Sequence, residues 1–180
     1  MKVHDFYNKV TNSYSDIIKE FLALLDRNRI DYAVIGGVGI NAYCEPIVTL
    51  DFDCIILKEK IDGLRKELRK AGFRVKTHPH TYKVTHRDSD IRIQIQRDER
   101  FQGFLKNVEI HQVFGYEMKV ARKEDLVLSK IWASYDKERS SLKRQKDKLD
   151  IQRLVDKYPS LKKIVDEIGN KGSDDHGSAI

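Results

Sequence analysis

The chain has 180 residues, with 34 lysines and arginines against 28 aspartates and glutamates, so its formal net charge is +6. With 40% hydrophobic and 34% charged residues, it is too apolar for a disordered chain and too polar for an integral membrane protein. No run approaches the roughly 18 apolar residues of a transmembrane helix, and residues 1–10 contain no apolar signal core. Two cysteines, Cys44 and Cys54, are too few for a disulfide framework and favour a reducing cytoplasm.

The first two thirds of the chain alternate between helix and strand patterns. Apolar residues at helical spacing predict a helix over 15–28, followed by a short buried strand, Asp31–Ile35, that runs into Gly36-Gly37. A compact helical stretch is expected over 38–43, and Thr49–Leu57 (TLDFDCIIL) predicts a second strand. The remaining expected elements are a helix over 59–71 and strands over 73–76, 82–86, 91–96, 108–114 and 118–121.

From Lys123 the pattern becomes helical, with helices expected over 123–135, 145–157 and 160–168. The basic segment Lys137–Lys148 links or opens the second of these; it is either a solvated helix face or a surface for an RNA backbone. We therefore expect an α/β (α+β) fold with a mixed sheet flanked by helices. Its parts are a core over 1–121, a C-terminal helical lobe over 122–171 and a disordered tail over 172–180.

Two aspartates in the second strand carry the clearest chemical signal. Side chains alternate along a strand, so Asp51 and Asp53 share one face, about 6–7 Å apart, while Phe52 and Cys54 share the other. Two neighbouring carboxylates repel each other unless a cation lies between them. Mg²⁺ (or Mn²⁺) accepts a few carboxylates together with phosphate oxygens, so this pattern predicts a metal site for a phosphorylated substrate.

Gly36-Gly37 strengthens this interpretation. Two glycines at the end of a strand allow unusual backbone angles and the close approach of a ligand. If a helix begins at Val38, its free N–H groups favour a phosphate at the same place. Alternatively, the glycines form an ordinary turn and the aspartates face water.

The sequence YAVIGGVGINAY…TLDFDCII resembles the signature of the nucleotidyltransferase (polymerase-beta-like) fold, and ARKEDLVLSKIWAS…RQKDKLDIQRL resembles the helices of AbiEii-type nucleotidyltransferases, toxins of type IV toxin–antitoxin systems. The resemblance implies that Gly36 and Gly37 cradle the triphosphate of an NTP. It also implies that Asp51 and Asp53 bind the metal ions, two Mg²⁺ in such enzymes, and that Thr49 contacts phosphate.

Members of this family usually add a third carboxylate from a neighbouring strand. The matching position here is Gln94, an amide that cannot act as a base or a strong metal ligand. Asp90 lies on the same face, four residues earlier, about 13 Å along the strand. Either Asp90 is the third acid, or two acids suffice, or the activity is weakened.

The resemblance further assigns Lys130 to the nucleotide phosphates and Asp147 to the active-site acids. Lys130 lies within an apolar helical stripe, so it either extends its amine to the surface or points into a cleft. Asp147 and Asp150 share a helix face, where acids are also favoured simply by a helix start.

The paired aspartates and the resemblance predict a metal-dependent transferase that moves a nucleoside monophosphate from an NTP to a hydroxyl acceptor. A tRNA end, a protein side chain and an aminoglycoside are open as acceptors, and the AbiEii-like helices favour tRNA or protein. The resemblance also implies an antitoxin as partner. Two alternatives stay open. One is a weakened or inactive nucleotide- or RNA-binding module on the same fold, motivated by Gln94. The other is an RNA-binding or partner protein that uses the basic helices and no nucleotide.

Overall fold

The computed structural model describes residues 3–174 of the chain. Contacts divide the chain into two compact units, Met1–Arg122 and Lys123–Ile180, called below the sheet unit and the helical unit. Among the described residues, no helix is both long and apolar enough to cross a membrane.

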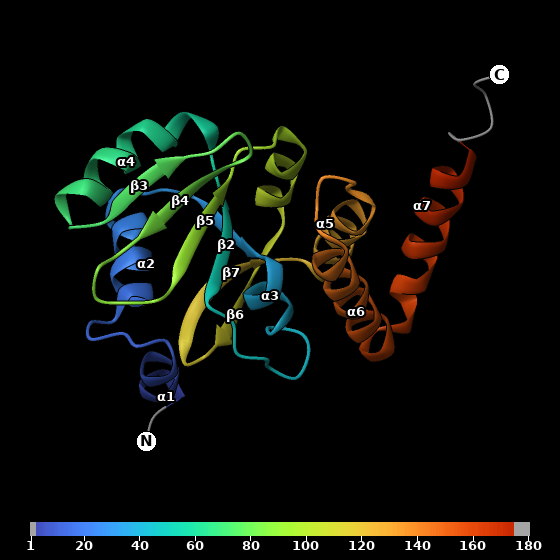
Figure 1. Ribbon diagram of the computed structural model, residues 1–180, viewed down its shortest axis with the longest axis horizontal. Helices are drawn as coiled ribbons and strands as arrows, with labels where there is room; N and C mark the ends of the chain where they lie inside the picture. The colour runs from blue at the N-terminus through green and yellow to red at the C-terminus, as the bar shows by residue number, and fades with distance from the viewer. Residues whose placement is uncertain (1–2, 175–180) are drawn as a thin grey trace. The chain divides into compact units, whose positions relative to one another are not determined.

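The sheet unit contains a seven-stranded mixed sheet in the order β3-β4-β5-β2-β1-β7-β6 (Figure 1). Strand β2 pairs antiparallel with β1 and parallel with β5, and β1 is parallel to β7. The strands are β1 (Tyr32–Ile35), β2 (Asp51–Ile56), β3 (Arg74–Thr77), β4 (Thr81–Thr85), β5 (Arg92–Gln96), β6 (Val108–Val113) and β7 (Tyr116–Ala121).

The core of this unit lies between one face of the sheet and two neighbouring helices, α2 (Ile17–Arg27) and α4 (Ile61–Lys70) (Figure 1). Phe21 of α2 meets the buried Phe52 of β2 edge to face, with ring centroids 5.9 Å apart. Arg65 of α4 lies over the ring of Tyr82, 5.1 Å from its centroid. Because strand side chains alternate, the aspartates beside Phe52 are directed to the opposite face of the sheet.

Two short helices complete the sheet unit: α1 (Val3–Val10), which the sequence analysis did not predict, and α3 (Gly36–Ile40), which begins two residues before the expected Val38. Helix α1 packs through Tyr7, whose ring stacks on Phe114 at 4.3 Å. A 3₁₀ helix over Glu99–Lys106 follows β5.

The helical unit contains α5 (Lys123–Tyr135), α6 (Ser141–Lys157) and α7 (Lys162–Asp174). Helix α5 has the predicted bounds and packs against α6 and α7. The basic segment opens α6, four residues before the predicted start, with Ser140 as N-cap accepting from the Lys143 N–H. Helix α7 extends three residues into the predicted tail, and the rest of that tail, 175–180, lies outside the described residues.

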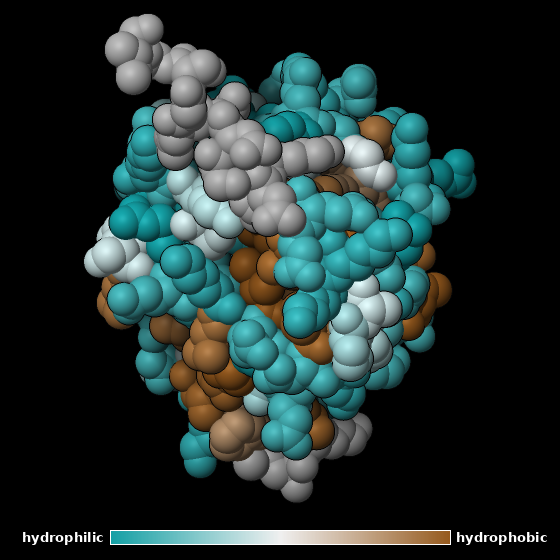
Figure 2. Space-filling view, turned by 90° about the vertical axis from the view of Figure 1, so that its right-hand side faces the viewer, coloured by the Kyte–Doolittle hydropathy of each residue, from teal (hydrophilic) through white to brown (hydrophobic). Residues whose placement is uncertain are grey.

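Hydrophilic residues cover most of the molecular surface seen in Figure 2, with smaller hydrophobic areas between them.

Candidate functional site

The first feature of the site is the contact between Gly36 and Asp53. Ile35, the last residue of β1, is paired in register with Asp53. Gly36 then takes a left-handed conformation, with φ of +64°, and a Cβ added there would lie 2.9 Å from the Asp53 Cβ and overlap its carboxylate. Only glycine combines this backbone angle with this lack of side-chain volume. The glycine therefore brings the Asp53 carboxylate directly against the main chain where β1 enters α3.

Thr49 connects the second glycine with the first aspartate. A Cβ on Gly37 would lie 3.7 Å from the Thr49 methyl, an ordinary contact. The Asp51 N–H donates to Thr49 Oγ1 at 3.2 Å, and the Tyr7 hydroxyl donates to the Thr49 carbonyl at 2.7 Å. The structure thus brings all five predicted residues of this motif, from Gly36 to Asp53, into one place.

The alternation expected for β2 is present. Asp51 and Asp53 are half-buried, whereas Phe52 and Cys54 are fully buried. Burial raises the pKa of the Cys54 thiol well above its ordinary value, and the neighbouring Asp53 charge adds to this shift. The aspartates therefore project from a strand whose opposite face is packed into the core through Phe52 and Cys54.

Strand β5 lies next to the aspartates and shows what stands at the third-acid position. Its parallel register pairs Asp51 with Arg92 and Asp53 with Gln94. The Arg92 Nε donates to Asp51 Oδ1 at 2.7 Å. The sequence analysis identified Gln94 as the family position, but it did not find the Arg92 ion pair, which depends on register between segments 41 residues apart.

Asp90 precedes β5 and lies in a different setting. Its carboxylate accepts a hydrogen bond from Asn12 Nδ2 at 2.6 Å, and its N–H donates to the Thr11 carbonyl at 3.0 Å. These contacts attach Asp90 to the turn after α1, and neither aspartate of β2 is in register with it. Its role as a third acid stays a prediction.

The two carboxylates suit a single divalent cation. Mg²⁺ commonly takes one or two protein carboxylates and completes its shell with water and substrate phosphates. The Asp53 carboxylate occupies the space beside Gly36 that any other residue's side chain would need, so it lies directly against the main chain. Across the described residues, no three or more His, Cys, Asp and Glu side chains gather as a metal site. Asp51 and Asp53 could therefore hold Mg²⁺ only with help from a substrate.

Lys130 and Asp147 meet in the helical unit. The Lys130 Nζ lies 3.0 Å from Asp147 Oδ1 and 2.7 Å from Asp150 Oδ2, and only 12% of the lysine side chain is exposed. Arg139 pairs with Asp147 at 2.9 Å and Arg153 with Asp150 at 3.0 Å. The acids are thus buried members of an ion-pair network rather than a solvated helix start.

The charge of Lys130 is stabilised by this network. Burial alone lowers the pKa of a lysine, but Asp150 and Asp147 outweigh burial and raise the Lys130 pKa above its ordinary value. The sequence analysis missed Arg139 and Arg153; the spacing of three between Asp150 and Arg153 was the available signal. A role for Lys130 and Asp147 at the nucleotide stays a prediction.

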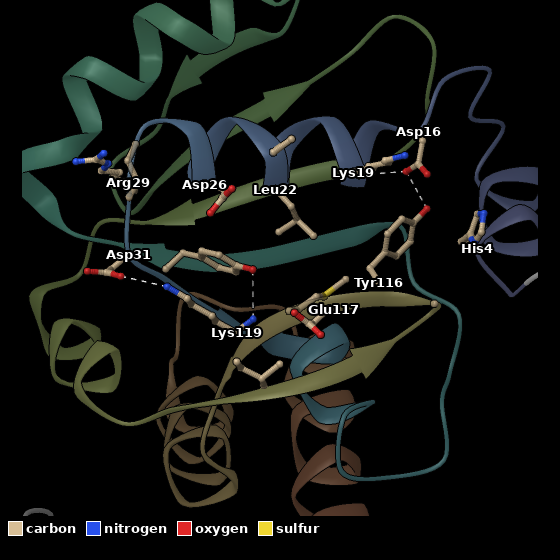
Figure 3. Close-up of a pocket in the computed structure, with 16 residues that line it drawn as sticks. His4, Asp16, Lys19, Leu22, Asp26, Arg29, Asp31, Tyr116, Glu117 and Lys119 are labelled. Atoms are coloured by element: carbon tan, nitrogen blue, oxygen red, sulfur yellow. Dashed lines mark hydrogen bonds and ion pairs between the residues drawn. The ribbon is translucent and has the colours of Figure 1, made fainter.

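A separate cavity of about 880 Å³ lies between α2 and the β6–β7 hairpin (Figure 3). Several of its polar groups pair with one another: the Tyr116 hydroxyl donates to Asp16 Oδ1 at 2.8 Å, and Lys119 lies 3.2 Å from Asp31 (Figure 3). The cavity is lined by both acidic and basic side chains, and neither the Gly36-Gly37 pair nor the two aspartates of β2 line it. We therefore locate the candidate site at Asp51 and Asp53.

Comparison with solved structures gives the fold. The lincosamide antibiotic adenylyltransferase LnuA is 14% identical with a TM-score of 0.55, over 79% of this chain and 97% of that one. The antibiotic-resistance factor ANT(2'')-Ia is 14% identical with a TM-score of 0.58, over 88% and 94% of the two chains. A nucleotidyltransferase-like protein from Paracoccidioides brasiliensis is 21% identical with a TM-score of 0.52, over 83% and 84%.

The chain has a nucleotidyltransferase fold. No protein-family model matches the sequence, and no curated protein matches it. At these identities the structural likeness concerns the fold alone, so the narrower AbiEii-type assignment stays a prediction. The expected mixed sheet with flanking helices is confirmed.

Proposed function

We propose that the protein transfers a nucleoside monophosphate from an NTP to a hydroxyl group, with Mg²⁺ (or Mn²⁺) as cofactor. The observation that carries this proposal is the placement of Gly36 against Asp53, with Thr49 and Asp51 beside them. It holds two carboxylates against a main chain that carries no side chain at Gly36, which suits a metal ion and the triphosphate that accompanies it.

In this proposal Asp51 and Asp53 hold the metal ion, and Gly36 and Gly37 receive the triphosphate. The acceptor hydroxyl loses its proton to solvent water and attacks the α-phosphate, a new P–O bond forms, and pyrophosphate leaves with the electrons of the broken P–O bond. Magnesium, when bound, supplies neutralisation of the phosphate charge. By the resemblance, Lys130 is assigned to the nucleotide phosphates and Asp147 to the active-site acids; the two form an ion pair at 3.0 Å in the helical unit.

RNA is the acceptor that the charges favour over protein. Register places Arg74, Lys76 and Lys83 of β3 and β4 on the same face as the aspartates, together with Arg92, and no acid of β3, β4 or β5 shares that face. A hollow of about 270 Å³ on this side is lined by Lys83 and Gln94, among others. A row of positively charged side chains beside the two aspartates suits the phosphate backbone of an RNA.

The test is transfer of label from each of the four α-labelled NTPs with Mg²⁺ to total RNA, to total protein and to antibiotics such as lincomycin. We expect labelled RNA, abolished by Asp51→Ala and by Asp53→Ala. Lys83→Ala should lower the amount of labelled RNA and should make the labelling less sensitive to salt concentration. Lys19→Ala, in α2 on the far face of the sheet, is the control. Failure to label any acceptor would contradict the proposal.

A toxin role in the cytoplasm, with an antitoxin partner, is the narrower form of this proposal. It rests on the AbiEii-like helices and on the low cysteine content, Cys44 and Cys54 alone, which favours a reducing compartment. Induced expression should stop growth in the wild type and not in Asp51→Ala. The alternative, a nucleotide- or RNA-binding module without catalysis, is favoured by Gln94 and Arg92 beside the acids. It predicts NTP binding without transfer, and toxicity that survives Asp51→Ala.

A further inference from the structure

The ion pair between Arg92 and Asp51 places a fixed positive charge where a metal ion would bind. Arg92 Nε donates to Asp51 Oδ1 at 2.7 Å, and the side chains are 45% and 38% exposed. The backbone supports this pairing, because Arg92 lies opposite Asp51 in the parallel register and its N–H donates to the Leu50 carbonyl at 2.8 Å.

The charges around the two aspartates do not suit two divalent ions. Asp51 and Asp53 supply two negative charges, Arg92 supplies one positive charge, and Gln94, next to Asp53, supplies none. Within the described residues, no His, Cys, Asp or Glu side chain joins the two aspartates as a third metal ligand. The formal charges of these four side chains sum to −1, and a cation that approaches Asp51 must share its carboxylate with the Arg92 N–H or displace it, and must tolerate the charge of Arg92.

We propose that Arg92 acts as a built-in cation at this site: it competes with the divalent ion for Asp51 in the free protein and limits the site to one divalent ion per nucleotide. This inference rests on the proposed function, since it concerns the same aspartates. Once nucleotide is bound, the planar guanidinium is free to donate to phosphate oxygens, for which its fork of N–H groups is well matched.

The size of the effect follows from the exposure of the pair. Exposed ion pairs contribute modestly, because water screens both charges. Removing Arg92 also removes a repulsive charge from the approaching cation. We therefore expect Arg92→Ala to tighten the binding of Mn²⁺ to the nucleotide-free protein by about three- to tenfold.

The experiment is a Mn²⁺ titration followed by electron paramagnetic resonance, which counts free Mn²⁺ and needs no catalysis. The matched control is Arg100→Ala, which breaks another exposed Arg–Asp pair of the sheet unit, with Asp98 at 2.6 Å. We expect tighter Mn²⁺ binding in Arg92→Ala, unchanged binding in Arg100→Ala, and loss in Asp51→Asn. Circular dichroism and thermal unfolding confirm that each variant is folded.

Stoichiometry is measured with a non-hydrolysable NTP analogue. The wild-type complex with the analogue should hold one Mn²⁺ per chain in total, and the complex of the double variant Arg92→Ala, Gln94→Asp should hold two. Unchanged Mn²⁺ affinity in Arg92→Ala, or two ions in the wild type, would overturn the inference even if transfer is active. The expected Mn²⁺ results without any transfer activity would support the inference and contradict the proposed function. Absence of Mn²⁺ binding in all variants would overturn both.

Discussion

Gly36 and Asp53 are in such close contact that any side chain at position 36 would overlap the carboxylate. We expect Gly36→Ala to move Asp53 and to cost about 1–3 kcal/mol for the strained left-handed backbone. A displacement near 1 Å at a reacting group can lower activity about 100-fold. Transfer assays and urea unfolding measure both effects.

Gly37→Ala is the matched control for this prediction, because its Cβ would make only an ordinary contact with Thr49. It should leave Asp53 in place and change the free energy of unfolding by less than about 1 kcal/mol. Equal activity of Gly36→Ala and the wild type would show that the close contact is unimportant.

Removing the Lys130 amine should destabilise the helical unit. Lys130→Met leaves Asp147 and Asp150, which are 2% and 3% exposed, with one cationic partner fewer each. Breaking a buried pair by deleting one partner typically costs about 3–5 kcal/mol. Lys163→Met, which removes an exposed lysine 3.9 Å from Glu167, should change little. Urea unfolding compares them, and similar small losses in both would contradict the prediction.

The contribution of Lys130 to the free energy of unfolding should decrease at alkaline pH. Its folded-state pKa is raised above the ordinary 10.5, mainly because Asp150 and Asp147 outweigh burial. Folding therefore favours the charged amine, and this contribution is complete below pH 10.5 and disappears as the pH rises through the folded-state pKa. The difference in unfolding free energy between wild type and Lys130→Met should stay constant up to that pH and shrink above it.

The two thiols should differ in reactivity. Cys54 is fully buried and its pKa is raised, so its reactive thiolate is scarce at neutral pH, whereas Cys44 is half-buried. Native protein treated with a maleimide should carry one label, on Cys44, and unfolded protein two. Mass spectrometry locates the labels; rapid labelling of Cys54 in folded protein would contradict the burial of β2.

Tyr7 should support Thr49 through a single hydrogen bond. Tyr7→Phe keeps the stacked ring but removes the donor to the Thr49 carbonyl, which typically costs about 1 kcal/mol. Tyr14→Phe is the control, since Tyr14 is 93% exposed. Thermal unfolding and NTP titration measure the change, and identical behaviour of the two variants would argue against a supporting role.

Patterns within one segment predicted much of this structure. The strand with Asp51 and Asp53, the glycine turn and the bounds of α5 follow from local alternation or helical spacing. Helix α1 was missed because it is short and depends on Tyr7 packing against Phe114. The Arg92–Asp51 pair depends on register between distant strands, which spacing does not reveal.

The mixed order of the sheet has a consequence for how the site forms during folding. Strands β2 and β5 are parallel neighbours, and this pairing brings Asp51 next to Arg92. The two residues are 41 positions apart in the sequence, with α4, β3 and β4 between them. Closing such a loop costs chain entropy before any contact compensates for it, so parallel pairing is a slow step. A nascent chain released before β5 has formed carries both aspartates but lacks the arginine beside them. The assembled site is therefore a property of the complete sheet, and a fragment that ends before residue 92 cannot reproduce it.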